Sequence, residues 1–133
     1  MSLMINIDVP DLEAGVRFYT EAFGLRVSRR FGTGFAELLG WPAPLYLLAK
    51  ASGTPGAGGD RRRYDRHWTP VHPDIVVDDL DPAVARAVEA GALLEAAAKD
   101  APYGRIAMLA DPFGHGFCLV QFNARGYEAL LDD

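Results

Sequence analysis

The sequence predicts an α+β protein built from two βαβββ modules, whose strands form a concave mixed β-sheet cleft with the helices packed outside. Two observations carry this prediction: segments with strand and helix periodicity follow one another in the same order twice, and the two halves share residues at a constant offset. At 133 residues the chain is long enough for one compact domain or two small halves that share a core. We place module 1 at about 3–50, a linker at 51–70, module 2 at 71–123 and a C-terminal tail at 124–133.

The internal repeat is clearest where each module begins. Its offset is 68 residues, as from Ile7 to Ile75, and it holds for four matched pairs: Ile7, Val9, Asp11 and Leu12 with Ile75, Val77, Asp79 and Leu80. One such half alone buries too little apolar surface to be comfortably stable. Pairing the halves predicts a concave face between them, and such a face is a common ligand site.

The first module reads as one strand, one helix and three strands. Residues 3–9 alternate between two faces, Pro10 ends that strand, and Asp11 is a good N-cap for the helix that follows. Apolar residues recur at helical spacing up to Phe23, and Gly24 is suited to end the helix. Strands are then predicted at 25–31, 34–39 and 44–50.

The linker is rich in Gly and Pro, and we expect 51–60 to be a mobile loop. Arginines gather in 61–66, either as a solvated stretch or as a clamp for an anionic ligand. The second module then repeats the first, with Asp81 expected to cap its helix. Its predicted elements are a strand at 71–77, a helix at 80–90 and strands at 93–97, 104–110 and 116–122, before a short helix in 126–131.

Composition excludes several classes of protein. The formal net charge of −5 argues against nucleic-acid binding, and no apolar run is long enough to span a membrane. The N-terminus lacks the layout of a signal peptide, and the single cysteine excludes an intrachain disulfide and disfavours a cysteine-based zinc site. We therefore expect a cytoplasmic protein without nucleic-acid or membrane partners.

Two motifs resemble a known family. The segment Val9-Pro10-Asp11-Leu12, followed by Phe23-Gly24-Leu25, and the turn Asp111-Pro112-Phe113-Gly114-His115-Gly116 are similar to the vicinal oxygen chelate superfamily. That superfamily contains glyoxalases, bleomycin-resistance proteins, fosfomycin-resistance enzymes and extradiol dioxygenases. The resemblance implies a single glyoxalase/bleomycin-resistance-like domain and a homodimer.

The resemblance also implies where a metal would bind. The superfamily's four ligand positions correspond here to Met4, Tyr46, His72 and Cys118, and of these only His72 is a usual ligand. A thioether, a neutral phenol, an imidazole and a thiol are a poor set for magnesium, manganese or ferrous iron. We therefore predict no metal and no other cofactor, with a divalent ion disfavoured.

Five residues form the predicted ligand-binding site: Tyr46, His72, Asp74, Arg105 and Cys118. His72 and Asp74 share a strand face, so the imidazole is a candidate general base beside a carboxylate. Cys118 is either an inert buried thiol or a thiolate activated by His72. The resemblance makes Arg105 a candidate anion contact, with an ordinary exposed arginine as the alternative.

These residues leave three functions open. The leading one is metal-independent binding of a small organic ligand, aromatic or anionic, in the cleft between the modules. The alternative is a lyase or isomerase of the glyoxalase type, with His72 as general base or residual metal ligand. The third is a dimeric accessory module that binds no ligand, so whether the protein is an enzyme stays open.

Overall fold

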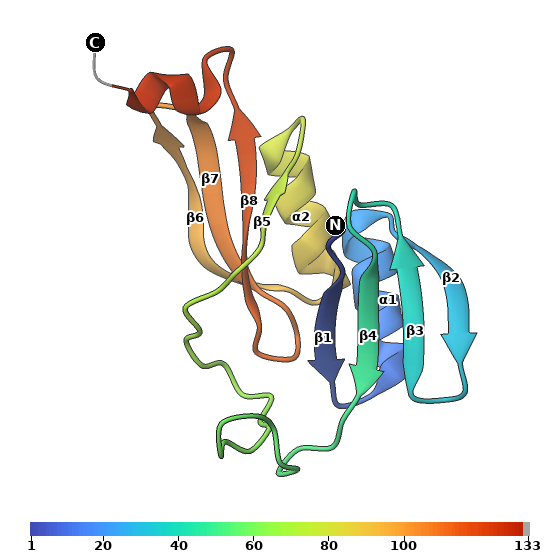
Figure 1. Cartoon of the computed structure of the whole chain (residues 1–133). Helices are drawn as coiled ribbons and strands as arrows, with labels where there is room; N and C mark the ends of the chain where they lie inside the picture. Colours follow the sequence, from blue (N-terminus) through green and yellow to red (C-terminus); the bar gives the residue numbers. More distant parts are fainter. Residues whose placement is uncertain (132–133) are drawn as a thin grey trace. The chain divides into compact units, whose positions relative to one another are not determined.

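The computed structural model describes residues 1–131, and it contains two four-stranded mixed sheets, each accompanied by one helix (Figure 1). The chain divides into two compact units, Met1–Asp65 and the part from Arg66 onward. Each sheet takes all its strands from one unit. The described residues include no helix long and apolar enough to cross a membrane.

Sheet 1 belongs to the first unit and has the strand order β1-β4-β3-β2 (Figure 1). Its edge strand β1 pairs with β4 in parallel, and the other two pairings are antiparallel. The elements are β1 (Ile5–Val9), α1 (Leu12–Phe23), β2 (Arg26–Phe31), β3 (Phe35–Leu39) and β4 (Leu45–Ala49).

Helix α1 begins and ends where the sequence predicts. The Asp11 side chain accepts a hydrogen bond from the backbone N–H of Ala14 at 2.8 Å, and Gly24 ends the helix with a φ of 68°. The helix approaches the sheet most closely at Gly15, where an added Cβ would lie 3.0 Å from a methyl group of Val9. Val9 therefore points toward α1, and strand alternation assigns Tyr46 and Glu37 to the opposite, helix-free face.

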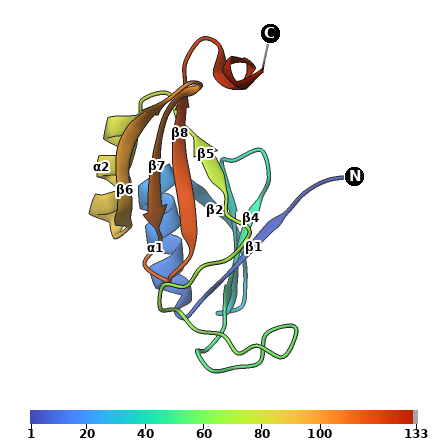
Figure 2. The same cartoon turned by 90° about the vertical axis from the view of Figure 1, so that its left-hand side faces the viewer.

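Sheet 2 has the equivalent strand order β5-β8-β7-β6, again with a parallel edge pair, β5 and β8 (Figure 2). Helix α2 packs against β6, β7 and β8. The elements are β5 (Asp74–Val76), α2 (Leu80–Ala90), β6 (Leu93–Ala101), β7 (Gly104–Ala110), β8 (Gly116–Phe122) and a 3-10 helix in the tail (Gly126–Leu130). The two modules thus have the same topology, which confirms the α+β class and the duplication.

Two local predictions in the second module were wrong. The strand expected over 71–77 is limited to β5, so His72 lies just before a strand rather than within it. The residue that caps α2 is Asp79, not Asp81, and its φ and ψ of −137° and 111° closely match those of Asp11. The first N–H of α2 donates instead to the side chain of Gln121 at 2.8 Å, because β8 carries that amide to the start of the helix.

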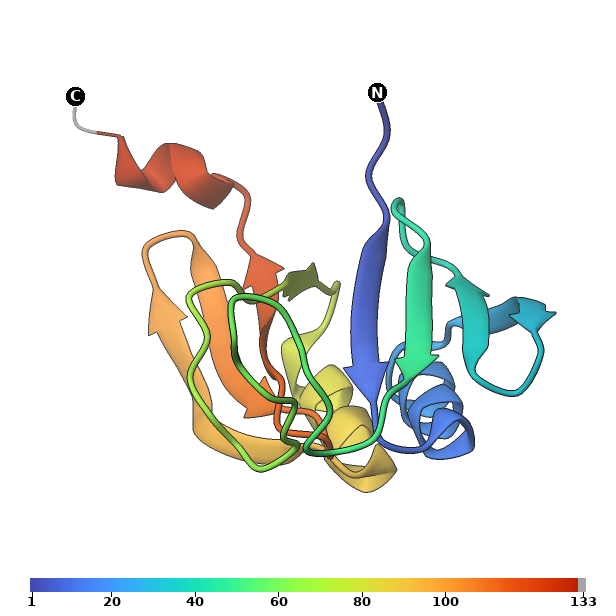
Figure 3. The same cartoon turned by 60° about the horizontal axis from the view of Figure 1, so that its bottom comes forward.

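The segment after β4 contains no helix or regular strand (Figure 3). Backbone hydrogen bonds close it on itself. Gly53 donates to the carbonyl of Arg62 at 2.7 Å, and Gly56 donates to the carbonyl of Asp60 at 2.8 Å. The guanidinium of Arg62 also donates to Asp8 on β1 at 2.7 Å. The segment is therefore a closed loop bonded to its own sheet, and the mobility of 51–60 stays a prediction.

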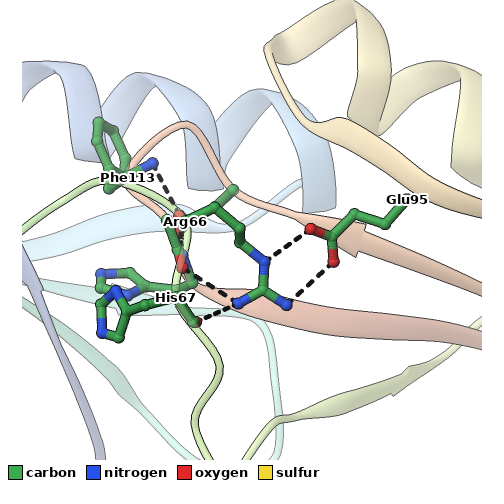
Figure 4. A network of polar contacts seen from close by, with 7 residues as sticks. Arg66, His67, Glu95 and Phe113 are labelled. Atoms are coloured by element: carbon green, nitrogen blue, oxygen red, sulfur yellow. Dashed lines mark hydrogen bonds and ion pairs between the residues drawn. The ribbon is translucent and has the colours of Figure 1, made fainter.

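A second arginine, Arg66, connects the start of the second unit to β6 and to the carbonyl of Gly114 in the turn before β8 (Figure 4). Arg66 donates twice to Glu95 of β6, at 2.7 and 3.0 Å, and bonds the carbonyl of His67. The turn itself is organised by Asp111, which is buried and accepts hydrogen bonds from the N–H groups of Phe113 and His115 at 2.8 and 2.9 Å. Arg62 and Arg66 thus have partners inside the protein, which weakens the anion-clamp hypothesis.

Candidate functional site

Strand register places equivalent residues of the two modules in equivalent rows. In sheet 1, Asn6 pairs with Tyr46, Tyr46 with Glu37, and Glu37 with Arg29, so these four cross the helix-free face in one row. In sheet 2, the same positions are filled by a second row, Asp74, Cys118, Met108 and Ala96. The register thus makes Tyr46 and Cys118 structural equivalents, as expected from the repeat.

The row in sheet 1 is a hydrogen-bonded ion pair with a phenol attached. Arg29 donates from Nε and Nη2 to the two carboxylate oxygens of Glu37 at 2.9 and 2.7 Å. The hydroxyl of Tyr46 donates to Glu37 Oε2 at 2.6 Å. The Glu37 side chain is only 7% exposed, whereas that of Arg29 is 61% exposed. The carboxylate is therefore the buried anchor of the row, and the guanidinium is its accessible end.

These contacts fix the ionisation of the row. The hydrogen bond from Arg29, assisted by that from Tyr46, lowers the pKa of Glu37 to about 2. The same carboxylate raises the pKa of Arg29 and of Tyr46 above their ordinary values. At neutral pH, Glu37 is therefore ionised, Arg29 is charged, and Tyr46 is a neutral phenol whose hydrogen is committed to Glu37.

The next row on the same face is aromatic at one end. Register aligns Asp8, Leu48, Phe35 and Phe31 across the four strands. The rings of Phe31 and Phe35 are 4.7 Å apart between centroids, and those of Phe35 and Tyr46 are 5.3 Å apart. The guanidinium carbon of Arg29 lies 5.3 Å from the Phe31 centroid, within cation–π range.

Three of the five predicted site residues come together in the second unit. His72 Nε2 lies 3.1 Å from Asp74 Oδ1, and Asp74 is directly opposite Cys118 in the parallel pair of β5 and β8. One donor atom from each of the three residues lies within 4.8 Å of the others. His72 and Asp74 are exposed and Cys118 is buried, so the cluster is a polar patch over a buried thiol.

The thiol of Cys118 is protonated at neutral pH. Burial, followed by the charge of Asp74 and a hydrogen bond to it, raises the pKa of Cys118 from 9.0 to about 11. A nucleophilic cysteine requires the opposite shift. The structure therefore favours the inert buried thiol over the activated thiolate.

We expect Cys118 to resist alkylation in the folded protein. Near pH 8 its thiolate fraction should be about a hundredfold below that of the unfolded chain, because the pKa is two units higher, and burial slows reagent access further. Mass spectrometry of iodoacetamide labelling, with and without urea, measures this difference. Equal labelling rates in the two conditions would show that the fold neither shields the thiol nor lowers its reactivity, which would contradict the inert buried thiol.

Arg105 is not brought into the cluster. It donates to both carboxylate oxygens of Asp81 on α2 at 3.1 Å. It also sits opposite Gln121, whose side chain reaches the start of α2, so Arg105 lies on the helix side of sheet 2. Cys118 lies three residues before Gln121 on β8, and strand alternation puts it on the other face. A ligand at the His72 cluster is thus on the opposite side of the sheet from Arg105.

The donors implied for a superfamily metal do not fit a hard cation. Tyr46 gives its hydrogen to Glu37, Cys118 offers a soft sulfur atom, and neither position supplies a carboxylate. His72, Asp74 and Cys118 form a different set, in which nitrogen, oxygen and sulfur are ligand types that zinc accepts. Three such donors fall one short of a closed structural zinc site.

Sequence reasoning missed two residues of the site in the first unit, Glu37 and Arg29. A usable signal was present, because Glu37 is a lone charge within the apolar strand Phe35–Leu39. A buried carboxylate needs a paired charge, and its partner should lie on an adjacent strand. The particular partner depends on a register shift between Val27 and Arg29 that composition does not reveal.

The fold and these rows define a small two-module protein with candidate ligand groups on the helix-free faces of its sheets. Residues 4–120 match the model of the glyoxalase-like domain family. The chain therefore belongs to the glyoxalase-like domain family, within the vicinal oxygen chelate superfamily.

Individual relatives span several activities. The anthracycline biosynthesis protein DnrV of Streptomyces peucetius is 43% identical over 63 residues, which are 47% of this chain and 22% of that protein. Among solved structures, the fosfomycin resistance protein FosX of Listeria monocytogenes has a TM-score of 0.72 at 16% identity, covering 98% of both chains. TnmS3, an antibiotic binding protein from Streptomyces sp. CB03234, has a TM-score of 0.62 at 25% identity, covering 92% of this chain and 98% of its own.

Proposed function

We propose that this protein binds a small organic molecule without using a metal ion. The observation that carries the proposal is the identity and burial of Cys118, whose soft thiol lies directly opposite Asp74 in the parallel pair of β5 and β8. It occupies the strand position where the superfamily's metal-dependent members are expected to place a carboxylate. A metal-free site of this kind offers shape, rings and hydrogen bonds to a ligand, as in bleomycin-resistance proteins.

The groups on the helix-free faces support binding. Sheet 1 offers aromatic rings beside the phenol of Tyr46 and an accessible guanidinium, and such a mixture of apolar surface with a few polar groups is typical of small-molecule sites. The second unit, taken by itself, offers the polar patch of His72 and Asp74. TnmS3 is an antibiotic binding protein and DnrV is an anthracycline biosynthesis protein, so antibiotics and related organic molecules are the class to screen. The proposal includes a homodimer and a cytoplasmic location.

A second candidate function is favoured by one distance. His72 Nε2 lies 3.1 Å from Asp74 Oδ1, and a carboxylate at that distance orients the imidazole ring. With Nε2–H donated to Asp74, Nδ1 is the atom that would accept a proton from a substrate. The alternative is therefore a lyase or isomerase in which His72 is the general base or a residual metal ligand.

A ligand screen with a histidine variant separates the two functions. We expect purified protein to contain substoichiometric metal by elemental analysis and to be stabilised by members of an organic metabolite library in a thermal-shift assay. A ligand at a hundred times its Kd adds about 2.7 kcal/mol to the free energy of unfolding, which raises Tm by several degrees. His72→Ala should weaken binding about tenfold through the lost hydrogen bond, and His67→Ala, which leaves the cluster intact, should not.

Other outcomes have distinct meanings. Stoichiometric zinc that is lost in both His72→Ala and Cys118→Ser would contradict metal-independent binding. Conversion of a bound compound that stops in His72→Ala, with Kd unchanged, would favour the lyase or isomerase. A screen without any stabilising compound would favour the accessory module that binds no ligand.

A further inference from the structure

We infer that the ligand is a planar, uncharged aromatic molecule carrying a carbonyl group, and that it is recognised on sheet 1 by Phe31, Phe35 and Arg29. This inference rests on the proposed binding function and names the class of molecule bound. It follows from the two rows on the helix-free face of sheet 1, one aromatic and one polar.

The aromatic part of this subsite is a connected set of rings with an accessible end. Phe31 is 43% exposed, although it is a large apolar side chain, and it lies on the edge strand β2. It contacts Phe35, which in turn contacts Tyr46, with interplanar angles of 36° and 54°. Tilted rings of this kind present faces and edges on which another flat ring system can stack.

The polar part is the guanidinium of Arg29. Glu37 takes two of its five N–H donors and holds the group in one orientation beside Phe31. The side chain remains 61% exposed, so further donors face outward next to the rings. A guanidinium fixed in this way loses little conformational entropy when it binds an acceptor oxygen.

Charge decides which acceptor suits the subsite. The positive charge of Arg29 is balanced by Glu37, which stays ionised down to strongly acidic pH. In the neighbouring row, the negative charge of Asp8 is balanced by Arg62 at 2.7 Å. The two rows are therefore neutral overall and offer donors without a net charge, which suits a carbonyl better than a carboxylate. Arg26, which pairs with Leu39 on the same face, is an exposed positive charge outside these two rows, so the charged probe below is needed to test the preference for a carbonyl.

Three probes with one ring system test this directly. We would titrate the protein with 9-fluorenone, with fluorene, which lacks the carbonyl, and with 9-fluorenone-2-carboxylate, which adds a negative charge. Calorimetric titration should show tightest binding for 9-fluorenone, with fluorene about tenfold weaker because the hydrogen bond to Arg29 is lost. The carboxylate should bind no more tightly than 9-fluorenone.

Variants locate the site. Phe31→Ala should weaken 9-fluorenone about three- to tenfold through lost stacking, and Tyr127→Ala, a similarly exposed aromatic in the tail, should leave it unchanged. Arg29→Lys keeps a charge opposite Glu37 while removing the planar fork, so it should remove the preference for 9-fluorenone over fluorene.

The results separate this inference from the proposed function. Tighter binding of the carboxylate, or 9-fluorenone binding that neither variant alters, overturns the inference. So does a library compound whose affinity depends on His72 but not on Phe31 or Arg29, and in that case the proposed function stands. Failure of all three probes overturns the inference as well, and the library screen then decides on the proposed function by itself.

Discussion

Gly104→Ala is expected to lower the free energy of unfolding by about 3–5 kcal/mol, enough to unfold a marginally stable domain. Gly104 begins β7 with a φ of +145°, which side chains rarely adopt. A Cβ there would lie 2.0 Å from the carbonyl oxygen of Gln121 and 2.9 Å from the backbone of Phe122 and Asn123. Because all three neighbours are backbone atoms of β8 and its end, they cannot move aside without breaking the pairing of β7 with β8.

A matched glycine separates steric conflict from backbone strain. Gly32 has a φ of +64°, and a Cβ there meets nothing within 4 Å. Gly32→Ala should therefore cost only about 1 kcal/mol, measured like the first variant by urea denaturation. Equal stability of the two variants would contradict the close approach of the backbone at Gly104.

Glu37→Gln is expected to lower Tm by on the order of 10 °C at pH 7. The change removes the charge that balances Arg29 and leaves an amide that cannot accept three hydrogen bonds as the carboxylate does. An N–H group of the new amide would also point toward Arg29 or Tyr46, whose groups are themselves hydrogen-bond donors. Scanning calorimetry of the variant at neutral pH measures the effect.

The same variant should alter the dependence of stability on pH. The folded state holds the pKa of Glu37 near 2, against 4.5 when it is not engaged. As the pH falls, Glu37 is therefore protonated in the unfolded chain before it is protonated in the folded protein. The stabilisation from Glu37 is complete above pH 4.5 and is lost as the pH falls toward 2. Glu37→Gln should lack this part of the acid-induced loss of stability. An unchanged slope between pH 4.5 and 2 would mean that Glu37 is not held by Arg29 and Tyr46 in solution.

An exposed pair of the same chemistry provides the control. Glu13 pairs with Arg30 at 2.7 Å, but its side chain is 69% exposed. Surface pairs of this kind contribute little, because water competes for both charges. Glu13→Gln should therefore leave Tm nearly unchanged, and the contrast with Glu37→Gln measures the effect of burial.

The sequence was sufficient to predict the fold and one part of the site. The offset of 68 and two matching Asp residues predicted the repeated topology, and Asp11 and Asp79 occupy equivalent N-cap positions, although Asp81 had been predicted as the second cap and only the Asp11 side chain makes a capping hydrogen bond. Asp74 and Cys118 face each other because the repeat and strand alternation constrain where they lie, whereas His72, which was predicted within a strand, joins them from just before β5. Such local and periodic rules act over short distances along the chain and can be applied without coordinates.

The remaining features depend on pairing between distant segments. Whether Arg105 faces the cluster or the helix depends on how many residues the turn before β8 takes up, since one residue more or less reverses the face. Arg29 reaches Glu37 only because β2 has a register shift beside it. Arg62 pairs with Asp8 and Arg66 pairs with Glu95, but the segment that carries these arginines has no periodic pattern from which the pairing could be predicted.

The turn from Asp111 to Gly116 shapes what sequence comparison can detect in chains like this one. The Asp111 carboxylate accepts hydrogen bonds from two backbone N–H groups, and Gly114 has a φ of 89°, which side chains rarely adopt. These requirements arise from the reversal of the chain, so a sequence profile dominated by this turn detects proteins that share the fold, whatever ligand they bind. A profile meant to separate such proteins by ligand would give more weight to the positions of the candidate site, which are Arg29, Phe31, Glu37, Tyr46 and Cys118.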